Sequence, residues 1–371
     1  MNIVRNIKQI NRDIKTITRP LRDIIAKFIL DKKRRTDKTL DFGKVKTILF
    51  LRDDNKIGDM VISTILFREI KKKYPKIKVI VLAGKDSKEI IKYNPYVDEI
   101  IETSDNLFAN FFILRKLRIY KIDVLVDFYR FNPRPYHMFK LRQINPSYLI
   151  GFCKNNYNMY DISLNNANFD TQHITNVYKL VLEYLGVENV SLQYDIFLSD
   201  LEEEYAKKIK EMFSQFKIIF LNACSASVKR NIKLSQLNNL IDLIYEKYKD
   251  VRIILNINDE MKKYMINKEY LYIPNKKNIL SIVALVKVSD IVITPDTSIV
   301  HIGAAYNKKM IALYLDYSHD EEKINIVWGP NYKNAFQISV DSRDSKIDND
   351  IKNIDNKLII QQLSKIIKMD K

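Results

Sequence analysis

Short apolar runs alternate with amphipathic stretches along most of this chain, from about residue 46 onward. In the first half, the runs at residues 47–51, 79–82, 99–101 and 124–128 are typical of buried strands. The stretches from residue 59 and near residues 88–93 and 107–117 carry apolar side chains at helical spacing. This alternation predicts right-handed βαβ units around a mainly parallel sheet.

A second series of the same kind begins further along the chain. Strands are predicted at residues 218–221, 251–255, 291–293 and 310–314, and helices at 234–248, near 260–266, at 279–288 and from 297. We place the boundary between the two series near residues 187–215, where no long Gly/Ser linker marks it. The pattern therefore predicts an α/β protein with two domains.

The segment before the first strand has a different pattern. Apolar residues recur there at spacings of three and four, which places them on one face of a helix: Ile3, Ile7, Ile10, Ile14, Ile17, Leu21, Ile24 and Phe28. Basic residues lie off this stripe, and a Lys-Lys-Arg-Arg run follows it. Such a basic amphipathic arm suits the surface of an anionic membrane, but it equally suits docking on the enzyme's own domain or on a partner.

Charge is concentrated in this arm. The 371-residue chain has 62 Lys and Arg against 45 Asp and Glu, a net +17. Residues 1–46 hold 14 basic and 5 acidic side chains, which supplies +9 of that excess. A basic surface can indicate nucleic acid, but zinc-finger spacing and a single-strand-binding aromatic motif are both missing. We therefore expect no nucleic-acid partner.

Two weaker features of the sequence suggest the cellular compartment of the protein. Apolar stretches are interrupted by charge well before 18 residues, so we expect neither a membrane span nor an export signal. Cys153 and Cys224 are the only cysteines, too few for a disulfide framework or a zinc site. Both features favour a reducing, cytoplasmic location.

Two strand ends carry polar motifs of the kind that bind ligands. After the strand at 291–293, Asp296, Thr297 and Ser298 open a helix whose free N–H groups form an anion site, although a plain helix cap would look the same. After the strand at 47–51, a polar loop ends at Gly58 and a helix begins with Asp59. Ligands in doubly wound sheets bind at strand ends of this kind.

Together, these motifs resemble a known family. Ile57-Gly58-Asp59, Asn94-Pro95-Tyr96-Val97-Asp98-Glu99-Ile100 and Asp296-Thr297-Ser298 through His301 occur in the order and at the separations of glycosyltransferase family 9, the bacterial heptosyltransferases. The resemblance covers about residues 46 to 328 and implies a GT-B fold, in which two Rossmann-like domains face each other across a cleft. It implies an acceptor domain at 46–190, a donor domain at 191–345, and a C-terminal helix at 346–371 that crosses back to the first domain. The basic N-terminal arm, residues 1–45, precedes these domains.

The resemblance also implies roles for single residues. Asp59 takes the position of the family's catalytic base, although an acid in the first turn of a helix also complements the helix dipole. Asp296, Thr297, Ser298 and His301 take positions that face the nucleotide-sugar donor, and Glu260 resembles an acid near the nucleoside. For His301, a packed structural histidine is an equally good interpretation.

Further candidates come from the residues themselves. The loop from Asn222 to Arg230 has small residues that let the backbone approach a phosphate. The family usually has a lysine before a Trp-Pro pair here, and this chain departs from that, so we rank Lys229 and Arg230 first and keep Lys233 open. Arg130 and Arg134 could hold an anionic acceptor or be a solvated pair.

These motifs and the family resemblance predict inverting, metal-independent and cofactor-free transfer of heptose. ADP-heptose is the expected donor, and a lipopolysaccharide or lipooligosaccharide core is the expected acceptor, at the inner face of the cytoplasmic membrane with residues 1–40 in peripheral contact. Two alternatives stay open: a relative that uses another nucleotide sugar or acceptor, and a non-catalytic nucleotide-sugar-binding scaffold. A dehydrogenase is disfavoured, because the first strand-to-helix turn lacks the G-x-G-x-x-G pattern.

Overall fold

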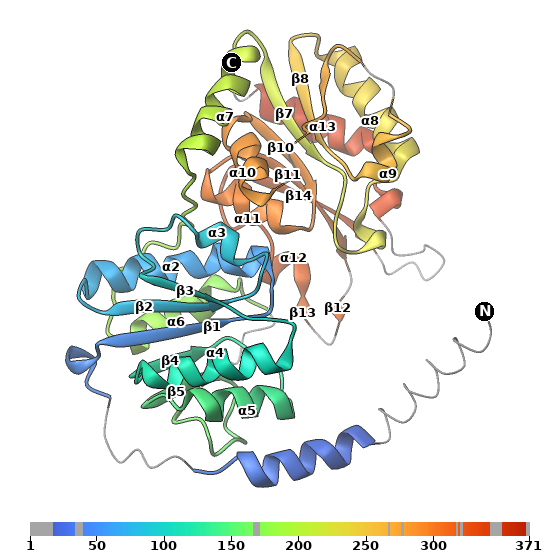
Figure 1. Cartoon of the computed structure of the whole chain (residues 1–371). Helices are drawn as coiled ribbons and strands as arrows, with labels where there is room; N and C mark the ends of the chain where they lie inside the picture. The colour runs from blue at the N-terminus through green and yellow to red at the C-terminus, as the bar shows by residue number, and fades with distance from the viewer. Residues whose placement is uncertain are drawn as a thin grey trace. The chain divides into compact units, whose positions relative to one another are not determined.

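The chain forms two compact units in a computed structural model (Figure 1), which describes residues 18–33, 40–165, 171–265, 268–275, 278–316, 318–319, 322–341 and 351–368. The first unit gathers the described parts of Met1–Asp54, Ile70–Lys85 and Tyr96–Asn166. The second gathers Asn55–Glu69, Asp86–Pro95 and Ala167–Lys371. Two short segments from the first half of the chain thus belong to the second unit.

The first unit is built on a six-stranded parallel sheet. Its strand order is β3-β2-β1-β4-β5-β6. This is the strand order of the Rossmann fold. The apolar runs suit these strands because both faces of a parallel sheet are buried, so near-continuous Ile, Leu and Val are covered on both sides. The strands are β1 (Thr47–Arg52), β2 (Lys78–Ala83), β3 (Glu99–Glu102), β4 (Val124–Asp127), β5 (Tyr148–Phe152) and β6 (Ile162–Leu164).

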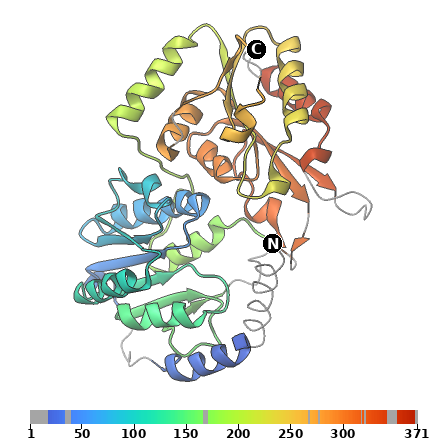
Figure 2. The same cartoon turned by 45° about the vertical axis from the view of Figure 1, so that its right-hand side comes forward.

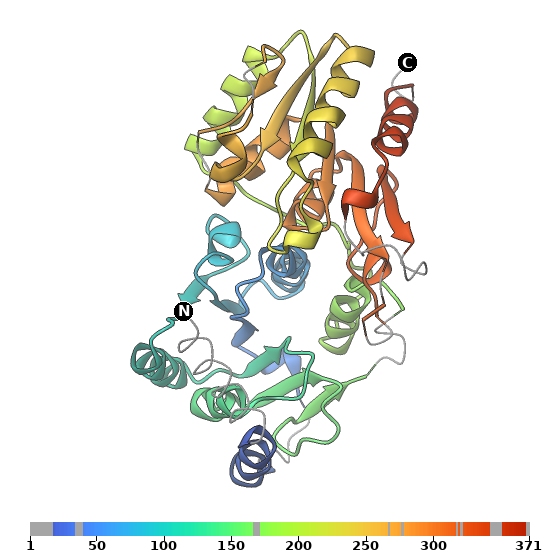
Figure 3. The same ribbon diagram turned by 90° about the vertical axis from the view of Figure 1, so that its right-hand side faces the viewer.

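Helices of the first unit share its core. The helix at residues 18–30, α4 (Leu107–Ile119) and α5 (Pro135–Ile144) contribute Ala26, Leu114 and Met138 to one apolar cluster with the sheet. Figure 3 shows these three helices nearly end on, next to one another. A short 3-10 turn, η1 (Phe42–Lys44), precedes β1.

The second unit repeats the architecture. Its parallel sheet has the order β14-β11-β10-β7-β8-β9, the Rossmann order again when the strands are numbered from β7. A two-stranded antiparallel pair, β12 (Ser318–His319) and β13 (Glu322–Lys323), lies apart from this sheet. The main strands are β7 (Lys217–Asn222), β8 (Val251–Asn256), β9 (Leu271–Tyr272), β10 (Ile291–Pro295), β11 (Lys309–Asp316) and β14 (Ala335–Asp341).

The remaining helices belong mainly to the second unit. The helix α2 (Ile57–Lys73) begins in the second unit and ends in the first. The others are α3 (Lys88–Ile91), α6 (Thr175–Tyr184), α7 (Asp200–Met212), α8 (Leu234–Lys247), α9 (Asp259–Lys262), α10 (Ile279–Val288), α11 (Ser298–Ala305), α12 (Ile324–Val327) and α13 (Asn356–Lys368), with the 3-10 turns η2 (Val228–Arg230) and η3 (Ile351–Asn353). None of the helices in the described residues is long and apolar enough to cross a lipid bilayer.

The C-terminal helix α13 packs within the second unit. Its buried residues Ile359, Leu363 and Ile366 join the core that also holds α8 and β11. The two helices α8 and α13 lie side by side in Figures 1 and 2. Its apolar face is covered by the second unit, where it shields one face of the sheet. The expected crossing of residues 346–371 to the first domain stays a prediction.

Both sheets reverse their strand order at one point. In the first sheet this point lies between β1 and β4, and in the second it lies between β7 and β10. Ligands of doubly wound sheets bind outside the carboxyl ends of the strands at this switch point. In the second unit those strand ends are Asn222 and Pro295, which places the loops after them at the candidate site.

Candidate functional site

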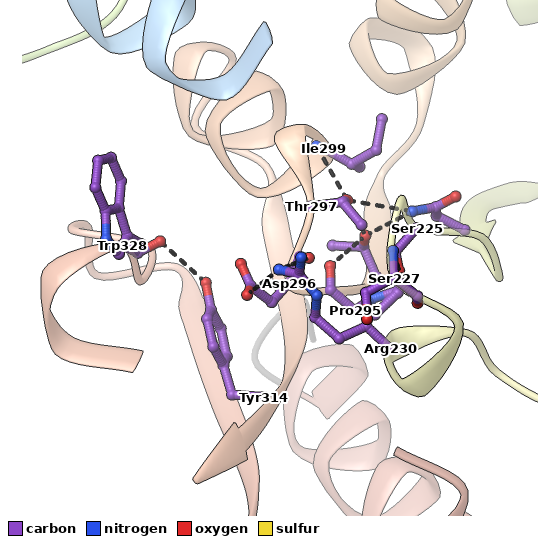
Figure 4. A network of polar contacts seen from close by, with 11 residues as sticks. Ser225, Ser227, Arg230, Pro295, Asp296, Thr297, Ile299, Tyr314 and Trp328 are labelled. Carbon is purple, nitrogen blue, oxygen red and sulfur yellow. Dashed lines mark hydrogen bonds and ion pairs between the residues drawn. The ribbon is translucent and has the colours of Figure 1, made fainter. Parts of the chain in front are cut away.

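Loops after β7 and β10 meet through one ion pair. Arg230, in the loop after β7, donates through Nη1 to the Asp296 carboxylate at 2.6 Å and to the Asp296 carbonyl at 3.2 Å (Figure 4). Burial raises the pKa of Asp296, and the Arg230 guanidinium opposes this. Two residues 66 positions apart are thus brought together at the switch point, and their role in donor binding stays a prediction.

Arg230 keeps donors for a ligand. Its Nε is buried and has no hydrogen-bond partner in the structure, although the side chain as a whole is about one-third exposed. A buried N–H without an acceptor is costly, and a phosphate oxygen would satisfy it. The Asp296 carboxylate is engaged by Arg230, so its first task is to hold the guanidinium in place.

The loop that carries Arg230 is closed on itself. Ser225 Oγ donates to the Ser227 carbonyl at 2.6 Å, Ser225 N–H donates to Asn231 Oδ1 at 2.6 Å, and Arg230 N–H donates to the Ser227 carbonyl at 3.0 Å. Ile232 N–H donates to the Ala223 carbonyl at 3.0 Å, which closes the loop at its base. These bonds organise the loop without a ligand, so little entropy would be lost on binding.

Thr297 caps the helix α11. Its Oγ1 accepts the Ile299 N–H at 3.2 Å, and Val300 N–H donates to the Thr297 carbonyl at 3.1 Å. The plain helix-cap interpretation is therefore correct for the Thr297 hydroxyl, and two of the N–H groups that we expected to face an anion are satisfied within the protein. Ser298, half-buried, is the first residue of this helix.

Asn222 organises the site, and the sequence analysis assigned it no role. Its buried Nδ2 donates to Thr294 Oγ1 at 3.0 Å, to Thr297 Oγ1 at 3.3 Å and to the Cys224 carbonyl at 3.1 Å. Its Oδ1 accepts from Asn256 Nδ2 at 2.9 Å. One amide thus ties the ends of β7, β8 and β10 together. The sequence did contain a signal for this role, because Asn222 is a polar residue at the end of an otherwise apolar strand.

His301 lies against the first turn of α2. A Cβ added to Gly58 would lie 2.8 Å from His301 Cδ2 and 3.6 Å from Ser298 Cα, so only glycine allows this approach. The ring is buried, Tyr194 meets it edge to face, and its Nδ1 has no hydrogen-bond partner. Burial, with the charge of His173, lowers the pKa of His301 to about 4, so the ring is neutral near pH 7.

Asp59 follows Gly58 in this first turn and is half-buried. Its charge raises the pKa of His301 against the effect of burial, which indicates that the carboxylate lies near the ring. Ser63 Oγ donates to the Asp59 carbonyl at 2.8 Å. The residues of Asn55–Glu69 belong to the second unit, so the candidate base and the Arg230–Asp296 pair are parts of one compact body.

Other predicted donor residues are more exposed. Lys229, Lys233 and Glu260 are all exposed, and Glu260 lies in the first turn of α9. Arg230, one of the three candidate cations, contacts Asp296. The roles of Lys229 and Glu260 stay predictions.

The first unit has a polar cluster at its own switch point. Asp127, at the end of β4, is buried and accepts from Tyr160 Oη at 2.6 Å and bonds to His137 Nε2 at 2.8 Å. Burial raises the pKa of Asp127, but His137 and Tyr160 outweigh this and leave it below its ordinary value. The loop after β4 carries Arg130, half-buried, and Arg134, exposed, which precedes α5.

A metal site has no support from the described residues, since no three His, Cys, Asp or Glu side chains among them could hold an ion.

Comparison with protein families gives a match that covers more than half of the chain. The model of glycosyltransferase family 9 (heptosyltransferase) matches residues 154–357 of the chain. Among curated proteins, a similar one is "Putative lipopolysaccharide heptosyltransferase 4" of Escherichia coli strain K12. It is 26% identical over 301 residues, which cover 80% of this chain and 82% of that protein.

Solved structures show the same fold. The glycosyl transferase family 9 protein from Veillonella parvula DSM 2008 aligns with a TM-score of 0.73 at 16% identity, covering 90% of this chain and 100% of that one. The E. coli ADP-heptose lps heptosyltransferase II aligns with a TM-score of 0.69 at 15% identity, covering 88% and 99%. The predicted GT-B fold with two Rossmann-like α/β units is confirmed.

Proposed function

Because the chain belongs to glycosyltransferase family 9, the heptosyltransferase family, we propose that it transfers heptose from ADP-heptose to a lipopolysaccharide or lipooligosaccharide core acceptor. The proposed reaction inverts the anomeric centre and uses neither a metal ion nor a cofactor. The donor is supported by the solved relative named as an ADP-heptose heptosyltransferase, and the acceptor by the curated relative's name.

The donor diphosphate is proposed to bind beside Arg230. The guanidinium is held by Asp296, retains a buried Nε–H without a partner, and stands at the switch point where nucleotides bind in Rossmann-like sheets. A cation here neutralises the charge that develops on the departing ADP, which lowers the barrier to bond cleavage. Lys229, Ser298 and Glu260 are proposed as further donor contacts.

Asp59 is proposed as the catalytic base. The acceptor hydroxyl oxygen attacks the anomeric carbon of the heptose, the bond from that carbon to the ADP oxygen breaks, and the hydroxyl proton passes to the Asp59 carboxylate. Attack from the face opposite the leaving group inverts the configuration. The His301 ring beside this turn is neutral near pH 7.

Acceptor binding is proposed for the first unit. Arg130 and Arg134 follow β4 at the switch point of the first sheet, and guanidinium groups bind carboxylate and phosphate in a bidentate manner. Inner-core acceptors carry such anionic groups. The proposed setting is the inner face of the cytoplasmic membrane, with the enzyme in peripheral contact.

One observation carries this proposal most directly: the contact of Gly58 with His301 and Ser298, which brings the turn containing Asp59 to the helix that begins after Asp296. A panel of nucleotide sugars tests it. We expect ADP-heptose and ADP to raise the melting temperature, and only ADP-heptose to give transfer. Stabilisation and turnover with a different nucleotide sugar would overturn the donor, and binding without any transfer would indicate a scaffold.

A further inference from the structure

An apolar stripe on the helix at residues 18–30 faces away from its own unit. Leu21, Ile24 and Phe28 are 63%, 66% and 75% exposed, and Ile25 and Ile29 beside them are also exposed. Burying such side chains is favourable and exposing several together is costly, so contiguous exposed apolar patches usually mark an interaction site. The first part of the predicted stripe, from Ile3 to Ile17, lies outside the described residues.

The opposite side of this helix is anchored to the first unit. Ala26 is buried, Arg142 Nε donates to the Leu30 carbonyl at 2.7 Å, and the buried Asp31 accepts the Met159 N–H at 2.8 Å. Lys27 Nζ lies 4.5 Å from the centre of the Tyr157 ring. The helix is therefore docked on its own domain by one side, as one alternative held, but its apolar stripe takes no part in that docking.

Positive charge surrounds the stripe. Residues 18–33 contain five cations, Arg19, Arg22, Lys27, Lys32 and Lys33, and two anions, Asp23 and Asp31, so the net charge of this segment is +3. Asp31 is buried and hydrogen-bonded to Met159 N–H, so the charge presented to a partner is more positive than this sum. A partner that fits must be apolar in its interior and anionic at its surface.

The helix α4 of the same unit presents a second face of this kind. Phe108, Phe112 and Ile119 are 80%, 65% and 80% exposed and recur at spacings of four and seven, which places them on one face of the helix. Exposed cations, Arg115, Lys116 and Arg118, lie between them. Figure 3 shows α5 between α4 and the helix at residues 18–30, and the contacts agree: α4 packs on α5, and α5 hydrogen-bonds to the end of that helix.

We propose that the docking face, defined as Leu21, Ile24 and Phe28 of the first helix with Phe108, Phe112 and Ile119 of α4, lies in the interface of an anionic lipid bilayer. The apolar side chains enter the headgroup and acyl boundary, and the flanking cations bind anionic headgroups. The inference deepens the proposed function, since a lipid-anchored acceptor would have to be met at that surface. Charge complementarity favours a bilayer over a second copy of this chain, because two copies would bring like charges together.

Vesicle flotation with the full-length chain tests the proposal. The probes are vesicles of phosphatidylglycerol and phosphatidylethanolamine, against vesicles of phosphatidylcholine alone. We expect binding to the anionic vesicles, weakened by salt, and a partition coefficient lowered at least about tenfold by L21S/I24S/F28S. F108S/F112S should lower it by a smaller factor, because it removes two of the six apolar side chains of this face, whereas L21S/I24S/F28S removes three.

A matched control is Leu201→Ser in α7. Leu201 is 75% exposed, as much as Phe28, but it precedes three glutamates, so L201S should leave binding unchanged. Three results would each overturn the proposal. The first is unchanged flotation of L21S/I24S/F28S, and the second is equal binding of the native chain to both vesicle types. The third is a native dimer that L21S/I24S/F28S dissociates while its flotation stays the same. The substituted side chains are exposed, and a melting temperature equal to that of the native chain checks the fold.

The experiments distinguish failure of the membrane-docking proposal from failure of the proposed function. Transfer to a lipid-free core acceptor in detergent-free buffer should be the same for L21S/I24S/F28S and the native chain. Flotation itself needs no donor or acceptor, so it reads out docking even if the donor assignment is wrong.

Discussion

Replacing Gly58 with alanine should damage the site through one methyl group. The added Cβ would lie 2.8 Å from His301 Cδ2, 3.4 Å from His301 Nε2 and 3.6 Å from Ser298 Cα. The first distance is shorter than side-chain carbons tolerate, so either the ring or the first turn of α2 must move. The ring has little room, because it is buried and meets Tyr194 edge to face.

Two opposing effects set the size of the change. Alanine in place of glycine favours a helix by about 0.5–1 kcal/mol, whereas overpacking a buried site costs about 1–3 kcal/mol. The clash should win, with a net loss of roughly 1 kcal/mol in the free energy of unfolding. Movement of the turn also displaces Asp59, and misplacement of a catalytic group by about 1 Å can cost about 100-fold in rate.

Urea unfolding and kcat for heptose transfer measure these two effects. G58A should lower kcat by about 10- to 100-fold with a smaller change in the dissociation constant for ADP. The double variant G58A/H301A removes the ring that the methyl group meets, so it should recover part of the lost rate relative to G58A alone. A G58A enzyme that is as stable and as active as the native chain would refute the reasoning.

Three further predictions follow from the same contacts. Arg230→Ala should weaken ADP binding by about 10- to 150-fold, the worth of a charge-assisted hydrogen bond, as titration calorimetry would show; unchanged affinity contradicts the phosphate role. Between pH 6.5 and about 4, His301 is protonated in the unfolded chain but neutral in the folded chain, so the free energy of unfolding should fall as the pH drops. His301→Gln should flatten this pH dependence, as urea unfolding would measure. Asn222→Ala should cost roughly 2–4 kcal/mol of stability, because it leaves several buried polar groups unpaired; a loss within measurement error would exclude its organising role.

Local patterns in the sequence predicted most of the sheets. Nearly continuous apolar runs form the strands β1, β2, β4, β7, β8, β10 and β11, and short runs of this kind are typical of strands buried on both faces of a parallel sheet. The sequence analysis missed α6, which ends just before the domain boundary that it placed near residues 187–215, and α7, which lies within that boundary. It also extended α9 beyond its single turn, Asp259–Lys262.

The site depends on pairings that local patterns do not contain. Arg230 and Asp296 were both candidates, but their ion pair depends on the adjacency of β7 and β10. Asn222 looked like an ordinary loop residue because its partners Thr294 and Asn256 lie at the ends of two other strands, β10 and β8. Periodicity likewise predicted the stripe through Leu21 and Phe28, but the anchoring of Leu30 and Asp31 decided that the stripe faces outward.

The central claim concerns the proton taken by Asp59, and a single-turnover assay of Asp59→Asn tests it most directly. The amide keeps the shape of the side chain and removes its ability to accept a proton, so ADP-heptose should bind with native affinity while transfer falls at least about 100-fold. Asp200→Asn is the matched control, an aspartate in the first turn of another helix, and should transfer at the native rate. Transfer by Asp59→Asn at the native rate would contradict the account.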